Sequence, residues 1–185
     1  MRVPQRKPFT IALIGHVGSG KTHIARLLAK KAGAAHINTD AIRVALRRRG
    51  KPESRAIAVA HRFQERLLRN GKPLVLDYDI ANPVRRRELR GRLRPFGARI
   101  YFMEIVTPER LILARLKRKR YTRADLFRNA DEAIRVYYFR KALRKKFLAK
   151  PTRRSGRRFT PDFTIDNAKP LGPQIRSVVK VIRGL

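Results

Sequence analysis

The sequence predicts a three-layer α/β/α fold, in which helices cover both faces of a parallel β-sheet. Five short apolar runs alternate with helical patterns along the 185 residues, and this alternation is typical of parallel strands joined by crossover helices. A glycine-rich loop separates the first apolar run from the first helical pattern, and an acidic residue ends the third run. Because ligands bind at the carboxyl edge of such sheets, we expect the functional residues there, within a single domain spanning residues 1–185.

Apolar runs and helical spacing place the individual elements. The expected strands are 9–14, 34–38, 73–77, 98–106 and 162–166. The expected helices run from the glycine-rich loop to about residue 31, over 39–49, from 54 to about 70, from 82, from 107, over 129–149 and over 174–182.

Capping and breaking residues mark the ends of several of these helices. They are Thr39 or Asp40 as the cap of the second helix, Gly50 as its end, Asn70-Gly71 as the end of the third, Asn82-Pro83 at the start of the fourth and Thr107-Pro108-Glu109 at the start of the fifth.

The glycine-rich loop is a complete phosphate-binding motif, G-x-x-x-x-G-K-T, following a strand and opening a helix as that motif requires. Its residues are Gly15, His16, Val17, Gly18, Ser19, Gly20, Lys21 and Thr22. Glycines let the backbone curl so that its N–H groups surround an anion at a helix N-terminus. Lys21 is expected to reach the β- and γ-phosphates, and the Thr22 hydroxyl to ligate Mg²⁺. The motif predicts binding of a nucleoside triphosphate.

The charge of the chain is extreme: 47 Lys and Arg stand against 13 Asp and Glu, a net charge of +34. The excess must face water, phosphates or an anionic partner. Two explanations account for this charge: the protein binds nucleic acid, or its source organism makes basic proteins in general. We predict nucleic-acid binding. The expected phosphate contacts are Arg85, Arg86, Arg87 and Arg90, the bases of a predicted lid at about 117–128, and a basic loop at about 150–160 with Arg153, Arg154, Arg157 and Arg158.

Composition excludes several classes of protein. Cysteine is absent, so disulfides and cysteine-based metal sites are excluded. No apolar run is long enough to span a membrane. The first apolar run leads into the phosphate-binding loop, which predicts a core strand rather than a signal peptide. We therefore expect a cytoplasmic protein without a membrane partner.

Asp40 and Arg43 follow the second strand and lie three residues apart, on one helix face. The carboxylate could accept a proton from an acceptor hydroxyl while the guanidinium holds an anionic group of the same acceptor. A helix-capping acid and a surface arginine would give the same pattern, but the phosphate-binding loop favours the catalytic interpretation.

Asp77 ends the apolar run Leu74-Val75-Leu76, where a carboxylate can hold Mg²⁺ through water. Asp79 lies two residues further and competes for that role. Thr22 and Asp77 are the predicted metal-side residues.

A basic stretch from Arg115 to Arg120 is expected to lead into a lid at about 117–128. A basic helix end and loop suit a lid that closes over phosphates and neutralises charge in the transition state. Arg118 and Arg120 are our candidates, although a solvated surface role explains any one of these bases equally well. Aromatic residues interleave with the bases, and helical spacing favours a core role over base stacking for most of them.

Together these motifs resemble the P-loop kinases, and most closely the branch with polynucleotide kinases, zeta-toxin-like kinases and seryl-tRNA kinases. The resemblance covers about residues 8–170: the Gly15–Thr22 loop, Asp40-x-x-Arg43, the Asp77 strand, the Arg115 region and the strand ending at Asp166. It implies a P-loop NTPase fold with strand order 2-3-1-4-5, ATP and Mg²⁺ as cofactors, and transfer of the γ-phosphoryl group to a hydroxyl.

The resemblance leaves the acceptor open. A nucleic-acid 5′-hydroxyl, or another anionic polynucleotide-like substrate, is the expectation that agrees with the charge. A small-metabolite kinase would use the same residues with an incidentally basic surface. A non-catalytic, nucleotide-dependent RNA-binding module would need Lys21 and Thr22 but not Asp40.

Overall fold

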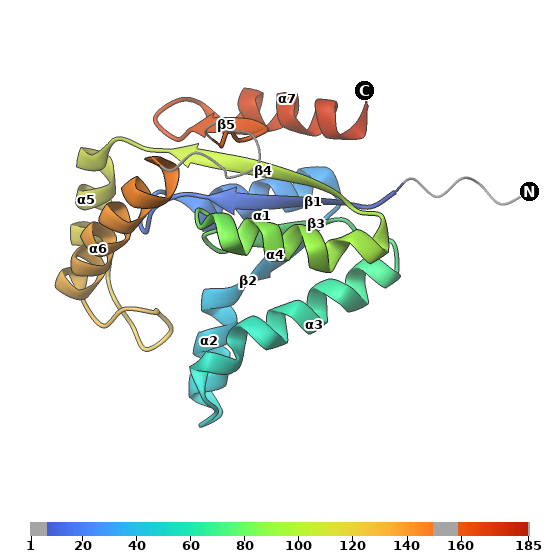
Figure 1. The fold of residues 1–185 in the computed structure, drawn as a ribbon. Coiled ribbons are helices and arrows are strands. Elements are labelled where there is room, and N and C mark those ends of the chain that lie inside the picture. The colour runs from blue at the N-terminus through green and yellow to red at the C-terminus, as the bar shows by residue number, and fades with distance from the viewer. Residues whose placement is uncertain (1–6, 150–158, 185) are drawn as a thin grey trace, which may run out of the picture.

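A five-stranded parallel sheet runs through the centre of the molecule (Figure 1). The computed structural model describes residues 7–149 and 159–184. The strands are β1 (Phe9–Ile14), β2 (Ala35–Asn38), β3 (Leu74–Asp77), β4 (Arg99–Val106) and β5 (Phe163–Asp166). Their order is β2-β3-β1-β4-β5, which confirms the predicted strand order and the three-layer fold.

Alternate residues of β1 enter two separate cores, one on each face of the sheet. Ile11 and Leu13 pack into the first core, while Ala12 and Ile14 pack into the second. All four side chains are at most 1% exposed. The central strand of a parallel sheet is buried on both faces, so its sequence reads as a continuous apolar run.

Four helices form the outer layers, two on each face of the sheet (Figure 1). Helices α1 (Lys21–Ala32) and α7 (Leu171–Arg183) cover the first core. Helices α3 (Ala56–Arg69) and α4 (Pro83–Leu93) cover the second. This arrangement leaves the carboxyl ends of the strands uncovered by the outer layers.

The remaining helices lie beside the carboxyl ends of the strands. Helix α2 (Thr39–Arg48) follows β2, and α5 (Glu109–Arg118) and α6 (Ala130–Ala149) flank the other side (Figure 1). Short 3₁₀ turns cover Glu53–Arg55 and Arg94–Phe96. A third cluster, built on Ile112, Leu116, Ala133 and Tyr137, packs α5 against α6. The loop between them, residues 119–129, occupies the position of the predicted lid.

Two predicted helix caps differ from the structure. The cap of α2 is Asn38, whose side-chain oxygen accepts a hydrogen bond from the Ala41 N–H at 2.7 Å, so neither Thr39 nor Asp40 has that role. Helix α5 has no side-chain cap, because the Thr107 hydroxyl donates instead to the Ser19 carbonyl at 3.0 Å. In both cases a residue at the carboxyl end of a strand, Asn38 or Thr107, makes the hydrogen bond that fixes the neighbouring segment.

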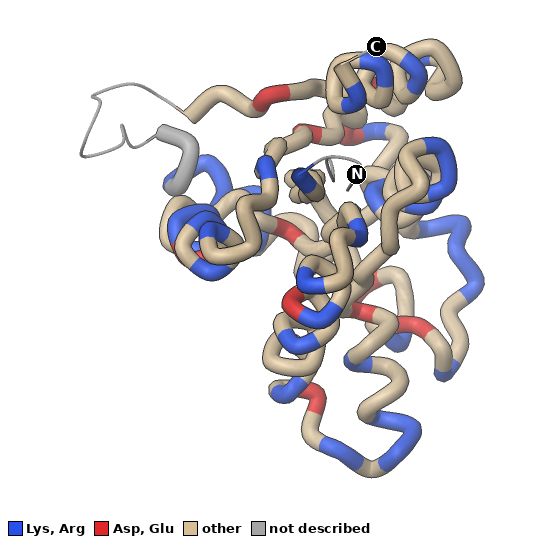
Figure 2. The backbone as a smooth tube through the Cα atoms, turned by 90° about the vertical axis from the view of Figure 1, so that its right-hand side faces the viewer, with Lys and Arg blue, Asp and Glu red and all other residues tan. Residues whose placement is uncertain are grey.

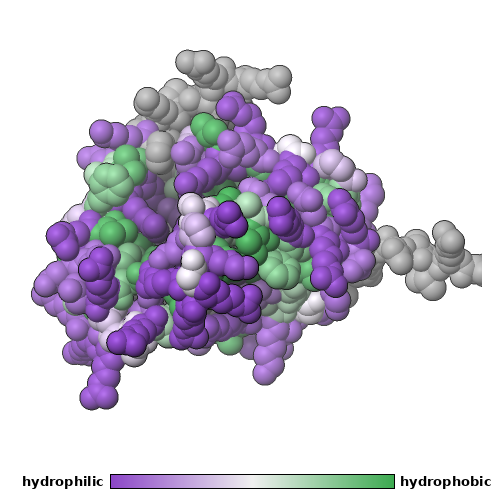
Figure 3. All heavy atoms as spheres, turned by 90° about the horizontal axis from the view of Figure 1, so that it is seen from below, coloured by the Kyte–Doolittle hydropathy of each residue, from purple (hydrophilic) through white to green (hydrophobic). Residues whose placement is uncertain are grey.

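Positive charge is distributed over every layer of the molecule (Figure 2). Seen from below, hydrophilic residues cover most of the face, with small apolar patches between them (Figure 3). Within residues 7–149 and 159–184, no helix combines the length and the apolar character that crossing a bilayer demands.

Candidate functional site

The loop from Gly15 to Gly20 adopts a backbone that only glycine accommodates at two positions. Gly18 and Gly20 have φ angles of 75° and 85°, in the left-handed region that side chains disfavour. A Cβ on Gly20 would lie 2.3 Å from the Asn167 amide nitrogen, and one on Gly18 would lie 3.0 Å from Leu116. The loop is therefore a close-fitting cradle, as expected for a backbone that surrounds phosphate oxygens.

Lys21 folds back over this loop. Its ammonium group donates to the carbonyls of Gly15 and His16 at 2.8 and 2.7 Å. Burial lowers the pKa of Lys21, and the charges of Asp79 and Asp77 partly counteract this effect. The ammonium is thus held within the cradle by weak carbonyl ligands, which a phosphate oxygen can replace with a stronger, charge-assisted contact.

Asp77 lies buried at the end of β3, with its side chain 3% exposed. It accepts a hydrogen bond from the Asn38 amide, and His36 Nε2 lies 3.3 Å from the same oxygen. Burial alone would raise the pKa of this carboxyl, but hydrogen bonds from His36 and Thr22 outweigh it and hold the pKa below its ordinary value. Asp77 is therefore an anion at neutral pH.

These residues fit a nucleoside triphosphate and Mg²⁺, the two groups that the phosphate-binding motif implies. Mg²⁺ in nucleotide sites usually takes one or two protein oxygens and completes its shell with phosphates and water, and the Thr22 hydroxyl and the Asp77 carboxylate supply such oxygens. No cluster of three or more metal-binding side chains occurs among the described residues. The Ser19 hydroxyl is buried without a hydrogen-bond partner in the described part of the chain, inside the same loop.

Asp40 and Arg43 form an ion pair on α2. Both side chains are partly exposed, at 50% and 27%, and both line the cavity that the phosphate-binding loop opens into. The predicted helix face is confirmed in its geometry, while the proposed roles of general base and acceptor contact stay predictions.

The cavity beside the loop has a volume of about 760 Å³. It brings together the loop, the ends of β2 and β3, the start of α4, the lid and the inner face of α6. Eight basic side chains line it against four carboxylates. The bases are Lys21, Arg26, Arg43, Arg85, Arg115, Lys119, Arg140 and Arg144, and the acids are Asp40, Asp77, Asp79 and Asp125. Such a surplus of positive charge suits an anionic occupant.

The lid arginines lie elsewhere than expected. Arg118 and Arg120 are exposed and are not among the residues that line the cavity, whereas Arg115 and Lys119 line it. The Arg115 side chain of α5 lies next to the phosphate-binding loop. A Cβ added to Gly20 would be 3.5 Å from a terminal guanidinium nitrogen of Arg115.

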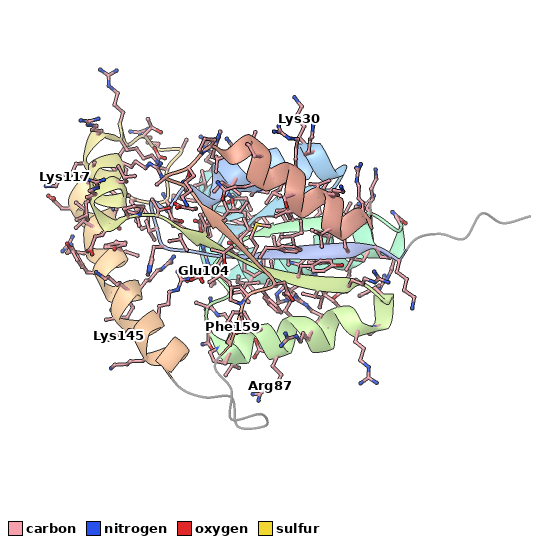
Figure 4. All side chains as sticks on the ribbon, turned by 90° about the horizontal axis from the view of Figure 1, so that it is seen from above. Lys30, Arg87, Glu104, Lys117, Lys145 and Phe159 are labelled. Atoms are coloured by element: carbon pink, nitrogen blue, oxygen red, sulfur yellow. The ribbon has the colours of Figure 1, made fainter. Side chains whose placement is uncertain are left out.

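Sequence reasoning missed the contribution of α6 to the cavity. Arg140 and Arg144 lie one turn apart and both line it. Arg144 is buried and pairs with Glu104 of β4 at 2.6 Å, and Figure 4 shows Glu104 in the interior while Lys117 and Lys145 point outward. The spacing of four between Arg140 and Arg144 was the available signal in the sequence. It was not sufficient, because basic residues lie on several sides of the 20-residue helix and do not show which side faces the cavity.

The predicted lid, residues 119–129, is attached to α2 through Arg47. Arg47 donates to the carbonyls of Asp125 and Leu126 at 3.2 and 3.5 Å and pairs with Glu53 at 2.6 Å. Within the lid, Lys119 forms an ion pair with Asp125. These contacts attach the 119–129 loop to α2.

Arg86 is not a surface phosphate contact, which corrects the expectation for α4. Its side chain is buried, donates to the carbonyls of Ile80 and Ala81, and stacks on Phe159 with 3.8 Å between the guanidinium carbon and the ring centroid. Figure 4 shows Phe159 against α4, with Arg87 pointing away from the protein. The basic stretch with Arg153, Arg154, Arg157 and Arg158 lies outside the described residues.

The sequence matches a family model described as an AAA domain over residues 11–140. The chain belongs to this family. No curated protein matches the chain by sequence. Among solved structures, it is similar to a putative kinase from Chloroflexus aurantiacus, with 16% identity, a TM-score of 0.69 and coverage of 97% of this chain and 98% of that one.

Two named kinases share the fold of this AAA domain protein. A gluconokinase from Sinorhizobium meliloti is 19% identical, with a TM-score of 0.57 over 97% of this chain and 94% of that one. APS kinase CysC from Mycobacterium tuberculosis, solved with AMPPNP and APS, is 15% identical, with a TM-score of 0.61 over 96% and 98%. These likenesses confirm the predicted P-loop kinase fold.

His16 provides a test of the geometry of the loop. Its ring meets Tyr137 of α6 edge-on at 5.4 Å between centroids, and burial, with the charge of Arg144, lowers the pKa of His16 to about 4. Since the unfolded chain takes up this proton as the pH falls through about 6.5, and the folded protein takes it up only near pH 4, stability should fall as the pH drops from 6.5 to 4. Urea unfolding across this range should show a smaller loss for His16→Gln than for the unsubstituted protein.

The control is His23→Gln, the same substitution at an exposed position of α1. His61, whose pKa burial also lowers, contributes equally to all three proteins. Equal acid sensitivity in His16→Gln and the unsubstituted protein would contradict the burial of a neutral His16.

Proposed function

We propose that this protein is an ATP-dependent kinase that transfers the γ-phosphoryl group to a hydroxyl of an anionic acceptor, with a nucleic-acid 5′-hydroxyl end as the preferred substrate. The observation that carries the proposal is the shared cavity, which Lys21, Thr22, Asp77, Asp40 and Arg43 all line. The placement of a phosphate cradle opposite an acid–arginine pair supports transfer rather than binding alone.

Each residue then has a role that follows from its position. The loop N–H groups and Lys21 hold the β- and γ-phosphates, and Asp40 receives the proton of the acceptor hydroxyl as the oxygen attacks the γ-phosphorus. Arg43 orients the acceptor. Thr22 and Asp77 would hold Mg²⁺, which when bound neutralises charge on the phosphates and aligns them for in-line transfer.

The negative charge of the transition state requires a further cation near the γ-phosphate. The basic residues that line the cavity differ from the lid arginines predicted from the sequence. Arg115 and Lys119 of the lid side and Arg140 of α6 line the cavity, so we assign them the stabilising role in place of Arg118 and Arg120. Arg140 is close enough to Lys21 for its charge to lower the pKa of the ammonium, which supports its position near the γ-phosphate.

The surface around the cavity supports a polyanionic acceptor. Arg43 and Arg85 line the acceptor side, and Phe139 of α6, which is 64% exposed, lines the same cavity. An exposed aromatic ring next to arginines can stack on a base while the arginines contact phosphates. The net charge of +34 would draw a polynucleotide toward the site over long range.

A small anionic metabolite is the second candidate acceptor. The gluconokinase and the APS kinase named above share the fold, and the Arg47 contacts draw the lid toward α2 over the cavity. A lid closed in this way would favour an acceptor that fits within about 760 Å³. Phosphoryl transfer from ATP labelled at the γ-phosphate, screened over 5′-hydroxyl oligonucleotides, hydroxy acids, neutral sugars and tRNA, distinguishes the candidates.

Lys21→Ala should abolish phosphoryl transfer, because it removes the cation that follows the migrating charge. Transfer of label from ATP measures the effect, with Lys31→Ala on the exposed end of α1 as the matched control. Circular dichroism should show an unchanged fold, since the fold depends on the apolar cores. Full transfer by folded Lys21→Ala protein would remove the kinase assignment.

Asp40→Asn should lower kcat by about 10²- to 10⁴-fold with little change in ATP affinity, as expected for the loss of a general base. Arg43→Ala should instead raise the acceptor KM, because it removes a binding contact. Steady-state kinetics with each substrate varied separates the two effects, and Arg48→Ala at the exposed end of α2 is the control. A large loss of ATP affinity in Asp40→Asn would place this residue on the metal side instead.

Binding of single-stranded oligonucleotides should weaken steeply with salt. Four to six phosphate contacts give a log–log slope of about −3 to −4, at about −0.7 per contact. Arg85→Ser with Arg87→Ser should reduce the slope and raise the acceptor KM, whereas Lys30→Ser with Lys31→Ser, an equal loss of charge on exposed parts of α1, should do neither. Oligonucleotides that bind but never accept phosphate, together with a hydroxy acid that does so at a salt-independent KM, would leave the metabolite kinase as the function.

A further inference from the structure

Tyr78 stands between two acids of the site and touches a buried polar side chain. It follows Asp77 at the end of β3, precedes Asp79 and lines the cavity. Its phenol oxygen lies 3.1 Å from the amide nitrogen of Gln64, a residue of α3 that is 0% exposed. Tyr78, which is partly buried, and the fully buried Gln64 side chain form one hydrogen-bonded pair.

Arg92 fixes the orientation of the Gln64 amide. Its terminal nitrogen donates to the Gln64 carbonyl oxygen at 2.7 Å, and an arginine offers only donors. The reversed amide would set its NH₂ group against the guanidinium, which costs a full hydrogen bond at a buried position. The Gln64 oxygen therefore faces Arg92, and its NH₂ group faces Tyr78.

The direction of the hydrogen bonds that run from Arg92 through Gln64 to Tyr78 determines what the Tyr78 hydroxyl can do. Since Gln64 donates, the phenol oxygen of Tyr78 accepts, and its own proton is left for another partner. Among the residues that the structure describes, the contact with Gln64 is the one hydrogen bond of the Tyr78 hydroxyl. The hydroxyl of a residue that lines the cavity is thereby left as a donor.

We propose that Tyr78 determines acceptor specificity by donating a hydrogen bond to an oxygen of the acceptor that carries no proton, such as that of a carboxylate or a phosphate ester. Gln64 and Arg92 are positioning residues that hold this polarity. The inference rests on the proposed function, because it concerns the acceptor of the same transfer reaction.

The surroundings place this donor on the acceptor side rather than the nucleotide side. The cavity wall near Tyr78 continues through Asp79, Ala81 and Asn82 to Arg85 at the start of α4, and through Ile57 of α3. The phosphate-binding loop belongs to the neighbouring strand, β1. Arg85 and Tyr78 together would contact one anionic group through a charge and a neutral donor.

The first test replaces the hydroxyl alone. Tyr78→Phe should raise the KM of the acceptor found in the transfer screen by about 10- to 100-fold, the range for a hydrogen bond to a charged group. The KM for ATP and kcat at saturating acceptor should change little. Tyr101→Phe removes the same atom from a β4 residue that packs on Phe163 outside the cavity, and should change nothing.

The second test reverses the polarity and keeps the hydroxyl. Gln64→Glu presents a carboxylate, which accepts the Tyr78 proton on one side and the Arg92 donors on the other. It should raise the acceptor KM as much as Tyr78→Phe, and the double variant should show no further loss. A merely structural role for Gln64 would give additive effects and a change in the KM for ATP.

The outcomes separate this inference from the proposed function. Absence of transfer to any acceptor in the screen would overturn the kinase function itself. Transfer at an unchanged acceptor KM in Tyr78→Phe would overturn the inference and leave the function standing. A hexonate accepted in preference to the matching neutral hexose, with the preference lost in Tyr78→Phe, would support the donor role toward a carboxylate. The same loss with a 5′-hydroxyl oligonucleotide would support it toward a phosphate.

Discussion

The hydrogen bonding of β1 between β3 and β4 is the interaction on which the rest of the molecule depends. Ala12 is in register with Leu76 on one side and with Phe102 on the other. This register ends β1 and β3 at the same edge, so the phosphate-binding loop emerges beside Asp77. The pairing of Asn38 with Asp77 in the neighbouring register then brings the start of α2, and with it Asp40, to the same place. A shift of one residue would exchange the faces of β1 and separate the loop from both acids.

Electrostatics explain why so basic a chain keeps four carboxylates in one cavity. Asp79, Asp77 and Asp40 all oppose the effect of burial, which lowers the pKa of Lys21. The same carboxylates limit repulsion among the arginines that face them. Basic side chains still outnumber the carboxylates that line the cavity, and such a surplus suits an anionic occupant.

Several arginines serve the fold rather than a ligand. Arg86 holds the loop after β3 by its carbonyls, Arg144 ties α6 to Glu104 of β4, and Arg47 ties the lid to α2. A guanidinium is suited to this work because it offers five donors in a fixed plane and stays charged. The high arginine content thus has a structural part, which lowers the number of arginines available for a polyanion.

The sequence by itself determined the elements and the nucleotide side of the site. The loop from Gly15 to Thr22 was predictable because its function lies in contiguous backbone, and the strands because burial on both faces produces unbroken apolar runs. The shared helix face of Asp40 and Arg43 was predictable because residues three apart lie on one side of a helix. The tertiary structure decided which bases face inward: Arg115, Arg140 and Arg144 rather than Arg118 and Arg120, and Arg86 in the interior. The physical reason is that an arginine-rich helix has similar composition on every side, so only its packing against the sheet selects the side chains that enter the cavity.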